Sequence, residues 1–547
     1  MFKNQLSVLC SFLFLTFLLL ICIWVLFSQR SRKKKFKKKN KKNKQSRTNR
    51  NEYHCIRFID KKTQNGIPLV CLTTTNDQNY YTDSDGYIAF YEPGLMNTKV
   101  YFHIKSDGYK YPKDFFGYEG VSIKTVKGGS TEIGLERTMI AERIYRVTGQ
   151  GIFRDSILLN KEEADYPPII SQVMGLDSVQ TTIYRNKMYW FWGDTNRVSY
   201  PLGNFSTTGA TTRPDLDLSQ VPPLFRFFEG KDGFVKGLIP FPKNGLKWID
   251  SVATLPITQK RKKEQLIGFY LYTPNSANEN KSIKEQGLIL WNDKSHQFEI
   301  ITTYEDNSCL FPTKPACISN GARIAQLHYE KGDQKTYLYL GYPFAVYRCK
   351  PSLKSISISR NWASFTCFQE GSRYDSFKIE RDGNGNVIWG WKKNTVPVTQ
   401  SVQEWLFREN NLEPEQRYWN IFDPESGKRL LSQSGTMFWN NYKKKYISII
   451  QQLNGTSFLG EIFYLDSNSF HGPWKNPIKI ITHNKYSFYN VFHHHRLDKE
   501  KGKIIFIEGT FANTFSQTKH PVPKYNYNQI MYQLDLSDKR LFLKKNN

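Results

Sequence analysis

A hairpin unit that occurs five times constrains the fold of this 547-residue chain more than any other feature of its sequence. In each unit a short polar or small segment leads into an apolar strand, a turn with Lys or Gly follows, and an aromatic strand ends at glycine. The units begin at Asp177, Asp250, Ala322, Gly435 and Asn490. Such repetition is typical of four-stranded sheets arranged radially in a propeller, and the structural alternatives are an elongated β-solenoid or stacked sandwiches.

The composition also favours strands. Aromatic residues make up 15% of the sequence, methionine occurs only 7 times, and long helical apolar stripes are hard to find. The chain is too long for one ordinary core, so two or more domains are expected. We therefore predict an all-β protein in four parts: a membrane anchor at 1–28, a basic disordered linker at 29–52, a β-sandwich at 53–137 and a β-propeller at 138–547.

The N-terminus combines an apolar run with a basic segment. Ser7 to Phe27 is almost uninterrupted apolar sequence, long enough to cross a bilayer as a helix, and no small-x-small cleavage site follows it. Residues 29–50 hold 13 Lys and Arg and no acidic residue, which suits acidic lipid headgroups. Nucleic acid is the rival partner for this charge, but no recognition motif accompanies it. We expect a membrane partner and no nucleic acid.

Two signals disagree about the side of the membrane. The positive-inside rule places the basic flank, and with it the folded part, in the cytoplasm. The six cysteines outside the apolar run instead form three close pairs, as disulfides in an oxidising compartment do. The pairs are Cys55/Cys71, Cys309/Cys317 and Cys349/Cys367. Glycosylation sequons at Asn204, Asn280 and Asn454 point the same way. We expect the folded part to be extracytoplasmic.

Residues 53–137 alternate apolar and polar positions between turn signals such as Asn65-Gly66 and Asp85-Gly86. The segments "TDSDGYIAF" and "VYFHIKSDGYKY" resemble the transthyretin-like or carboxypeptidase-regulatory sandwich modules. The resemblance implies a spacer or binding module rather than an enzyme, with Cys55 and Cys71 joining adjacent strands.

A second resemblance covers roughly residues 138–547. The repeated hairpins and the segment "LDSNSFHGPWKNPIKIITH", with its Gly-Pro-Trp at 472–474, resemble the five-bladed β-propeller glycosidases, which include arabinanases, xylosidases and fructosidases. In that family, acidic residues at the starts of the innermost strands converge on a central pocket. The resemblance implies that Asp177 acts as base or nucleophile and that Asp250 orients the site and modulates pKa values. Both residues head the tripeptide Asp-Ser-Val, and the alternative is that each caps a turn.

The third unit departs from this pattern, because Arg323 stands where the family's general acid usually lies. Candidates for the acid come from the last unit, where Glu508 ends a strand and His493, His494 and His495 are consecutive. Strand alternation turns His494 away from the other two histidines and argues against one metal ion bound by all three. We expect no metal site and no required cofactor, with a structural cation in the pocket as an open option.

The stretch "MYWFWGDTNR" joins an aromatic strand to a polar turn. Its tryptophans could stack on a sugar ring while the polar groups bind hydroxyls, or they could pack between sheets. We interpret it as a carbohydrate-binding rim. Its predicted members are Trp192, Asp194, Asn196 and Arg197, with His494 and Arg323 as further contacts.

These features favour a membrane-anchored carbohydrate-active protein whose pocket carboxylates could hydrolyse glycosides. The missing acid in the third unit favours the alternative, a non-catalytic propeller that binds glycans or proteins, and a structural adhesion or envelope protein is a third option. No GxGxxG, P-loop, GxSxG or HExxH motif is present, which argues against nucleotide-dependent and zinc-protease chemistry.

Overall fold

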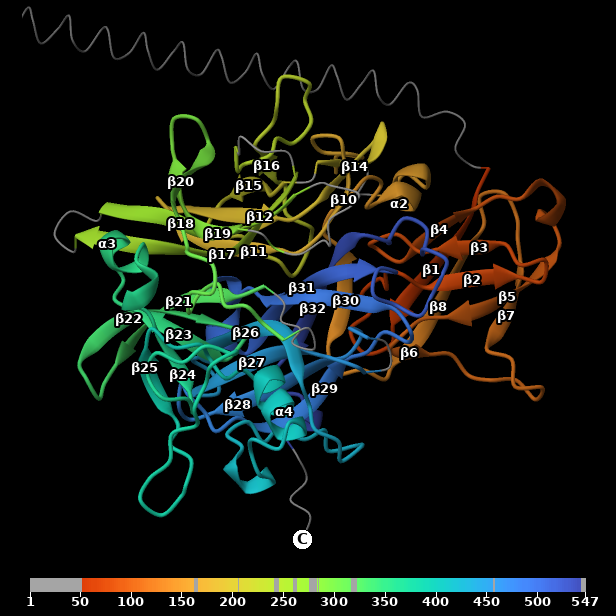
Figure 1. Cartoon of the computed structure of the whole chain (residues 1–547). Helices are drawn as coiled ribbons and strands as arrows, with labels where there is room; N and C mark the ends of the chain where they lie inside the picture. The colour runs from red at the N-terminus through yellow and green to blue at the C-terminus, as the bar shows by residue number, and fades with distance from the viewer. Residues whose placement is uncertain are drawn as a thin grey trace, which may run out of the picture.

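Strands dominate the regular structure of the protein (Figure 1). The computed structural model describes residues 52–161, 166–204, 206–240, 245–258, 263–274, 283, 285–315, 322–455 and 458–542. Three short α-helices occur in this part of the chain: α2 (Arg154–Leu158), α3 (Leu353–Ile356) and α4 (Gln400–Arg408). The predicted all-β class is confirmed.

The predicted membrane anchor, and the basic linker up to residue 51, lie outside the described residues. Within the described part, no helix has both the length and the apolar character needed to span a bilayer.

Two four-stranded sheets are built from residues 54–137. The first has the order β4 (Tyr87–Phe90), β1 (His54–Asp60), β8 (Ser130–Arg137) and β6 (Tyr109–Lys110), and the second has β3 (Asn79–Tyr81), β2 (Cys71–Thr74), β5 (Lys99–Lys105) and β7 (Gly120–Lys124). Alternate residues of β5 are buried, as a strand with one face on a core requires. The sheets meet there, where Phe90 and Phe102 pack edge to face with ring centroids 5.1 Å apart.

The cysteines correct one prediction, because Cys55, Cys71, Cys309, Cys349 and Cys367 all carry free thiols. Cys55 lies on β1 and Cys71 on β2, in different sheets, so they do not join adjacent strands. Cys349 ends β23 (Ala345–Cys349) and Cys367 follows β24 (Ala363–Thr366). These strands pair with Arg348 opposite Ala363, so the two cysteines do not lie opposite each other. Cys317 lies outside the described residues. Each of the three predicted pairs therefore contains a free thiol, and the cysteines do not support an oxidising compartment.

Five antiparallel sheets follow in chain order, and each begins with one of the five predicted hairpins. The first sheet contains β11 (Gln180–Tyr184), β12 (Lys187–Trp192), β15 (Thr208–Thr212) and β16 (Arg226–Phe227). The second sheet contains β17 (Gly245–Thr258), β18 (Lys263–Pro274), β19 (Glu285–Asn292) and β20 (Gln297–Thr303). The third sheet contains β21 (Ile324–Glu330), β22 (Lys335–Gly341), β23 (Ala345–Cys349), β24 (Ala363–Thr366) and β25 (Gly390–Lys393), and the fourth contains β26 (Ser432–Asn440), β27 (Lys445–Gln452), β28 (Ile462–Ser467) and β29 (Lys475–Ile481). The fifth contains β30 (Ser487–His493), β31 (Ile504–Ala512), β32 (Asn528–Asp535) and, as its outer strand, β9 (Glu142–Arg146). A separate three-stranded sheet contains β10 (Val173–Leu176), β13 (Thr195–Arg197) and β14 (Tyr200–Asn204).

The five sheets form a ring, because residues from all five first strands or their immediate continuations line one cavity. Strand β9 pairs with β32, so the beginning and the end of this region are joined in one sheet. Neighbouring first strands contact one another: Gln180 Nε2 at the start of β11 donates to the carbonyl of Asp250 within β17, and Asp250 pairs with Arg323 just before β21. We call this arrangement the five-sheet ring. Its strand-start end is the end at which the first strands β11, β17, β21, β26 and β30 begin, and its strand-finish end is the end at which they finish.

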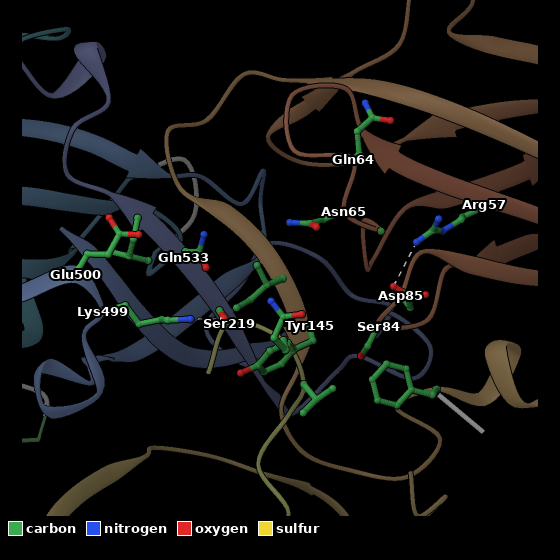
Figure 2. Close-up of a pocket in the computed structure, with 16 residues that line it drawn as sticks. Arg57, Gln64, Asn65, Ser84, Asp85, Tyr145, Ser219, Lys499, Glu500 and Gln533 are labelled. Carbon is green, nitrogen blue, oxygen red and sulfur yellow. Dashed lines mark hydrogen bonds and ion pairs between the residues drawn. The ribbon is translucent and has the colours of Figure 1, made fainter. Parts of the chain in front are cut away.

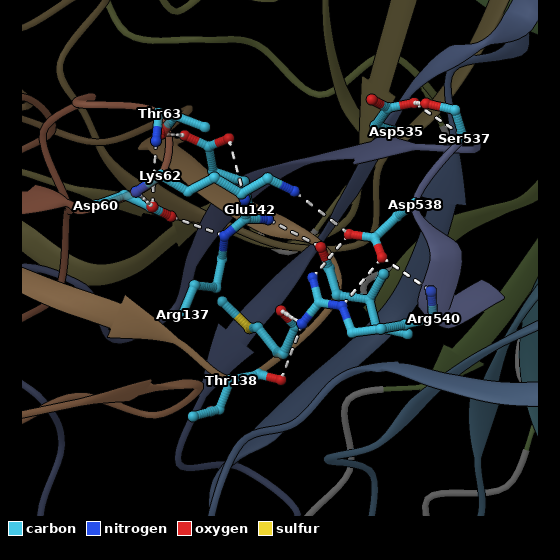
Figure 3. Close-up of polar contacts among 12 residues, drawn as sticks. Asp60, Lys62, Thr63, Arg137, Thr138, Glu142, Asp535, Ser537, Asp538 and Arg540 are labelled. Atoms are coloured by element: carbon cyan, nitrogen blue, oxygen red, sulfur yellow. Dashed lines mark hydrogen bonds and ion pairs between the residues drawn. The ribbon is translucent and has the colours of Figure 1, made fainter.

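The N-terminal sheets and the five-sheet ring share one hydrophobic core. A polar network reinforces their junction (Figure 3). Arg137 on β8 donates to Asp60 on β1 (Nε to Oδ2, 2.7 Å) and lies 3.8 Å from Glu142 on β9. Arg540 donates to the carbonyls of Thr138 and Met139. The junction is therefore a packed interface rather than a linker.

A cavity of about 510 Å³ lies at the same junction (Figure 2). Its cationic side chains already have acidic partners: Arg57 lies 3.6 Å from Asp85, and Lys499 lies 2.9 Å from Asp217. Because these two cations are already paired with carboxylates, the charges of this cavity do not point to one class of ligand.

Candidate functional site

Asp177 is the centre of a polar cluster at the strand-start end. It lies just before β11 and is half-buried. The Tyr489 hydroxyl donates to its Oδ2 at 2.9 Å, and the Tyr527 hydroxyl and the Asp194 backbone N–H donate further hydrogen bonds. Burial, followed by the charge of Asp194, raises the pKa of Asp177 to about 7. This carboxyl can therefore gain or lose a proton near neutral pH.

Asp194 is the second carboxyl of the cluster and is also half-buried. It follows β12, and the Trp248 indole Nε1 donates to its Oδ1 at 2.8 Å. Burial raises its pKa above the usual range, against the opposing effect of the Trp248 hydrogen bond. Asp177 and Asp194 thus form a carboxyl pair in which the charge of Asp194 disfavours ionisation of Asp177.

Gly193 allows the Asp177 carboxyl to lie close to the backbone that carries Asp194. Its backbone N–H donates to the Asp177 carbonyl at 2.8 Å. A Cβ atom at position 193 would lie 2.2 Å from Asp177 Oδ1, well inside van der Waals contact. Glycine is the residue that lets the Asp177 carboxyl lie against this backbone.

We expect the Gly193→Ala substitution to lower the free energy of unfolding by about 1–3 kcal/mol, the usual cost of overpacking. The methyl group would push the Asp177 carboxyl away from its tyrosine donors. Thermal unfolding checks this, with Gly383→Ala as the control, because a Cβ there meets nothing within 4 Å. Equal melting temperatures for the two variants would contradict the crowded geometry.

Aromatic side chains frame the carboxyl pair. Trp248 and Tyr527 are half-buried, and Tyr489 is buried with its hydroxyl on Asp177. Phe515 packs edge to face on Tyr489 at 5.6 Å, and 55% of its surface is exposed. An exposed ring beside hydrogen-bonding carboxyls suits a ligand with both hydroxyl groups and apolar C–H faces.

Asp250 has a different environment from Asp177, although both begin an Asp-Ser-Val tripeptide. Its carboxylate forms an ion pair with the Arg323 guanidinium, and both residues are buried. The guanidinium lies 5.6 Å from the Phe269 ring and 5.8 Å from the Tyr347 ring. Burial lowers the pKa of Arg323, but the charge and hydrogen bond of Asp250, together with Tyr342 and Tyr347, raise it above its ordinary value. The structure thus gives both residues a structural partner, and it does not bring them into the carboxyl pair.

Glu508 and His494, predicted as acid and substrate contact, lie inside the protein. Neither side chain has exposed surface, and His494 Nε2 lies 2.8 Å from Glu508 Oε2. The Trp190 ring covers His494 with centroids 5.0 Å apart. Strand β31 continues past Glu508 to Ala512, so the residue sits mid-strand rather than at a strand end.

The structure places most members of the predicted rim apart from the carboxyl pair. Trp192 is 1% exposed and stacks on Trp190, so it serves packing rather than ligand binding. Arg197 lies on β13, pairs with Asp232 and covers the Phe234 ring at 4.8 Å. Asn196 lies half-buried on the same strand. Of the rim residues, the structure brings Asp194 together with Asp177.

The sequence interpretation missed Trp248, Tyr489, Tyr527 and Phe515. Trp248 lies two positions before Asp250, and Tyr489 lies one position before the fifth unit. Closeness to the start of a repeated unit is therefore the sequence signal that could have found both residues. Within the described residues, no group of three or more His, Cys, Asp or Glu side chains is placed to hold a metal ion.

Comparison with known proteins gave no matching family model and no matching curated protein. Three of the similar solved structures are carbohydrate-degrading enzymes. An exo-β-1,3-galactanase from Phanerochaete chrysosporium with galactose has 10% identity and a TM-score of 0.32, over 66% of this chain and 61% of that one. The catalytic domain of a GH62 α-L-arabinofuranosidase from Coprinopsis cinerea has 8% identity and a TM-score of 0.32, over 66% and 92%.

An endo-1,5-α-L-arabinanase from Thermotoga petrophila RKU-1 in complex with TRIS has 11% identity and a TM-score of 0.32, over 67% of this chain and 72% of that one. Similarity at this level does not assign an activity. The functional assignment rests on the residues of the site.

Proposed function

We propose that this chain is a carbohydrate-active protein whose five-sheet ring is a five-bladed propeller with its site at the strand-start end. The observation that carries the proposal is the pair of half-buried carboxyls, Asp177 and Asp194, framed by Trp248 and the exposed Phe515. Carboxyls bind sugar hydroxyls, and an aromatic face packs on the apolar side of a sugar ring.

The same pair supports glycoside hydrolysis, which normally requires one carboxyl as acid and another as base or nucleophile. Asp177, with its pKa raised to about 7, holds a proton at mildly acidic pH and acts as the proton donor. Asp194 then acts as base or nucleophile. This assignment exchanges the role expected for Asp177 and leaves Asp250 to stabilise the ring through Arg323.

A second candidate is binding of a glycan without turnover. It is favoured by Arg323, which stands at the start of the third unit where the general acid is expected and forms an ion pair with the Asp250 carboxylate. Turnover that depends on Asp177 would exclude this candidate.

The position of the protein in the cell is a separate proposal from the sequence. The apolar run at 7–27 holds the chain in a membrane, and the basic linker contacts acidic headgroups. The folded part is proposed to face away from the cytoplasm, where the sequon at Asn454 would carry a glycan. Glycosidase treatment of the protein from its native host would test this by a mobility shift.

A panel of polysaccharides and aryl glycosides tests the function, with binding and released reducing ends measured together. We expect Phe515→Ala to weaken binding by roughly two- to tenfold, because an aromatic contact contributes about 0.5–1.5 kcal/mol. Phe116→Ala is the matched control, since that ring is 80% exposed on the N-terminal sheets. No binding to any carbohydrate, or equal losses in both variants, would overturn the proposed site.

A further inference from the structure

A cavity of about 300 Å³ lies on the axis of the five-sheet ring. It extends toward the strand-finish end, away from Asp177. Its lining includes His328 near the end of β21, Trp439 near the end of β26, and Arg496 just beyond β30. This volume is at the lower end of those that hold small molecules and suits a molecule built on a single ring.

The cavity offers flat apolar surface. Phe438 stacks on His495 at 3.6 Å, and Phe470 stacks on His328 at 3.9 Å. Trp439 is 45% exposed and packs edge to face on Tyr446 at 5.1 Å. All of these aromatic residues line the cavity. The stacked pairs occupy each other's faces, so Trp439 is the aromatic side chain that offers exposed surface to a ring-shaped ligand.

The charge of the cavity is positive. No acidic residue occurs among its described lining residues. Arg496 is exposed, and within the described part of the chain its guanidinium has no carboxylate partner. The carboxylate of Glu330 lies 3.9 Å from Nε2 of the lining residue His328 and is bound by His471 at 2.6 Å and by the Tyr339 hydroxyl at 2.5 Å.

We propose that this axial cavity is a second binding site, which takes a small carboxylate carried on a six-membered ring. The Arg496 guanidinium binds the carboxylate through its paired N–H donors, a geometry that arginine provides and lysine does not. The ring packs against Trp439, and the amide of Gln326, also in the lining, is placed for hydroxyl groups on the ligand. The site is separate from the carboxyl pair and does not depend on hydrolysis.

Calorimetric titration of the full chain with matched probes tests the proposal. Benzoate is compared with benzamide, and glucuronate with glucose, so that each pair differs in charge on a shared ring. We expect at least one carboxylate to bind about tenfold or more tightly than its neutral partner, the size of a charged hydrogen bond. The pair that shows the preference identifies the ring as aromatic or sugar.

The Arg496→Gln variant is expected to lose this preference, and Arg496→Lys to keep only part of it. Arg408→Gln, an exposed change on α4, is the control and keeps the preference. Asp177→Asn should also bind the carboxylate normally, which separates failure of this site from failure of the carbohydrate site. Equal binding of charged and neutral probes, no binding of any probe, or unchanged binding by Arg496→Gln would overturn the proposal.

Discussion

Replacing Arg323 with methionine is expected to lower the free energy of unfolding by about 3–5 kcal/mol, the cost of breaking a buried ion pair by removing one partner. Arg323 is 2% exposed and Asp250 is 4% exposed, so water cannot take over the lost interaction. The aspartate would keep the Arg323 backbone N–H at 3.3 Å as a weak donor. Urea denaturation of the wild type and the variant measures the difference.

The double variant Asp250→Leu with Arg323→Met separates loss of the charge pair from loss of packing. Two apolar residues of similar volume leave no charge buried, and such replacements are often neutral or stabilising. We expect the double variant to regain most of the stability that Arg323→Met loses. A single variant within about 1 kcal/mol of the wild type would show that the pair contributes little, as exposed pairs do.

The strands of the ring could be predicted because their signal is local. Each hairpin pairs neighbouring residues, as β26 and β27 do from Asn440 opposite Lys445, and its turn and aromatic strand lie within one short stretch. The period of two along a strand is visible in such a stretch without knowledge of the rest of the chain.

The burial of individual residues could not be predicted in the same way. Strands β12 and β31 are buried on both faces, so alternation assigns no side chain to solvent. The sequence pattern therefore predicts Trp192 and Glu508 as site residues, although β12 and β31 are packed on each side. The predicted disulfides failed for a related reason, since sequence proximity of Cys55 and Cys71 does not show that they lie in different sheets.

The two carboxyls of the site could be predicted from the sequence, but the tyrosines that contact Asp177 could not. Asp177 and Asp194 stood out because each begins or ends a repeated strand. Tyr489, which holds the Asp177 carboxyl, is 312 positions away in the chain, and Tyr527 is still further. Contacts over that distance arise only when the ring closes, so no local pattern could have predicted them.

The Asp177→Asn substitution is expected to reduce turnover of the best glycoside by about 10²–10⁴-fold, the contribution of a positioned acid or base. Asparagine keeps the size of the side chain and accepts hydrogen bonds at one position, but it cannot supply a proton. The wild-type rate should fall as pH rises through about 7, because Asp177 then loses its proton. The residual rate of the variant should lack this fall. The ratio of kcat/KM values across pH 5–9 measures both effects.

Folding stability provides the independent control for this variant. The pKa of Asp177 in the folded chain, about 7, exceeds the ordinary value of 3.8, so the folded chain binds this proton more tightly than the unfolded chain does. The resulting stabilisation is complete below about pH 4 and is lost as pH rises through about 7. Asparagine does not ionise, so at pH 8 the variant should be at least as stable as the wild type. A slow but stable variant would thus place the loss in proton transfer, whereas unchanged turnover would leave Asp177 a ligand-binding group and favour the non-catalytic function.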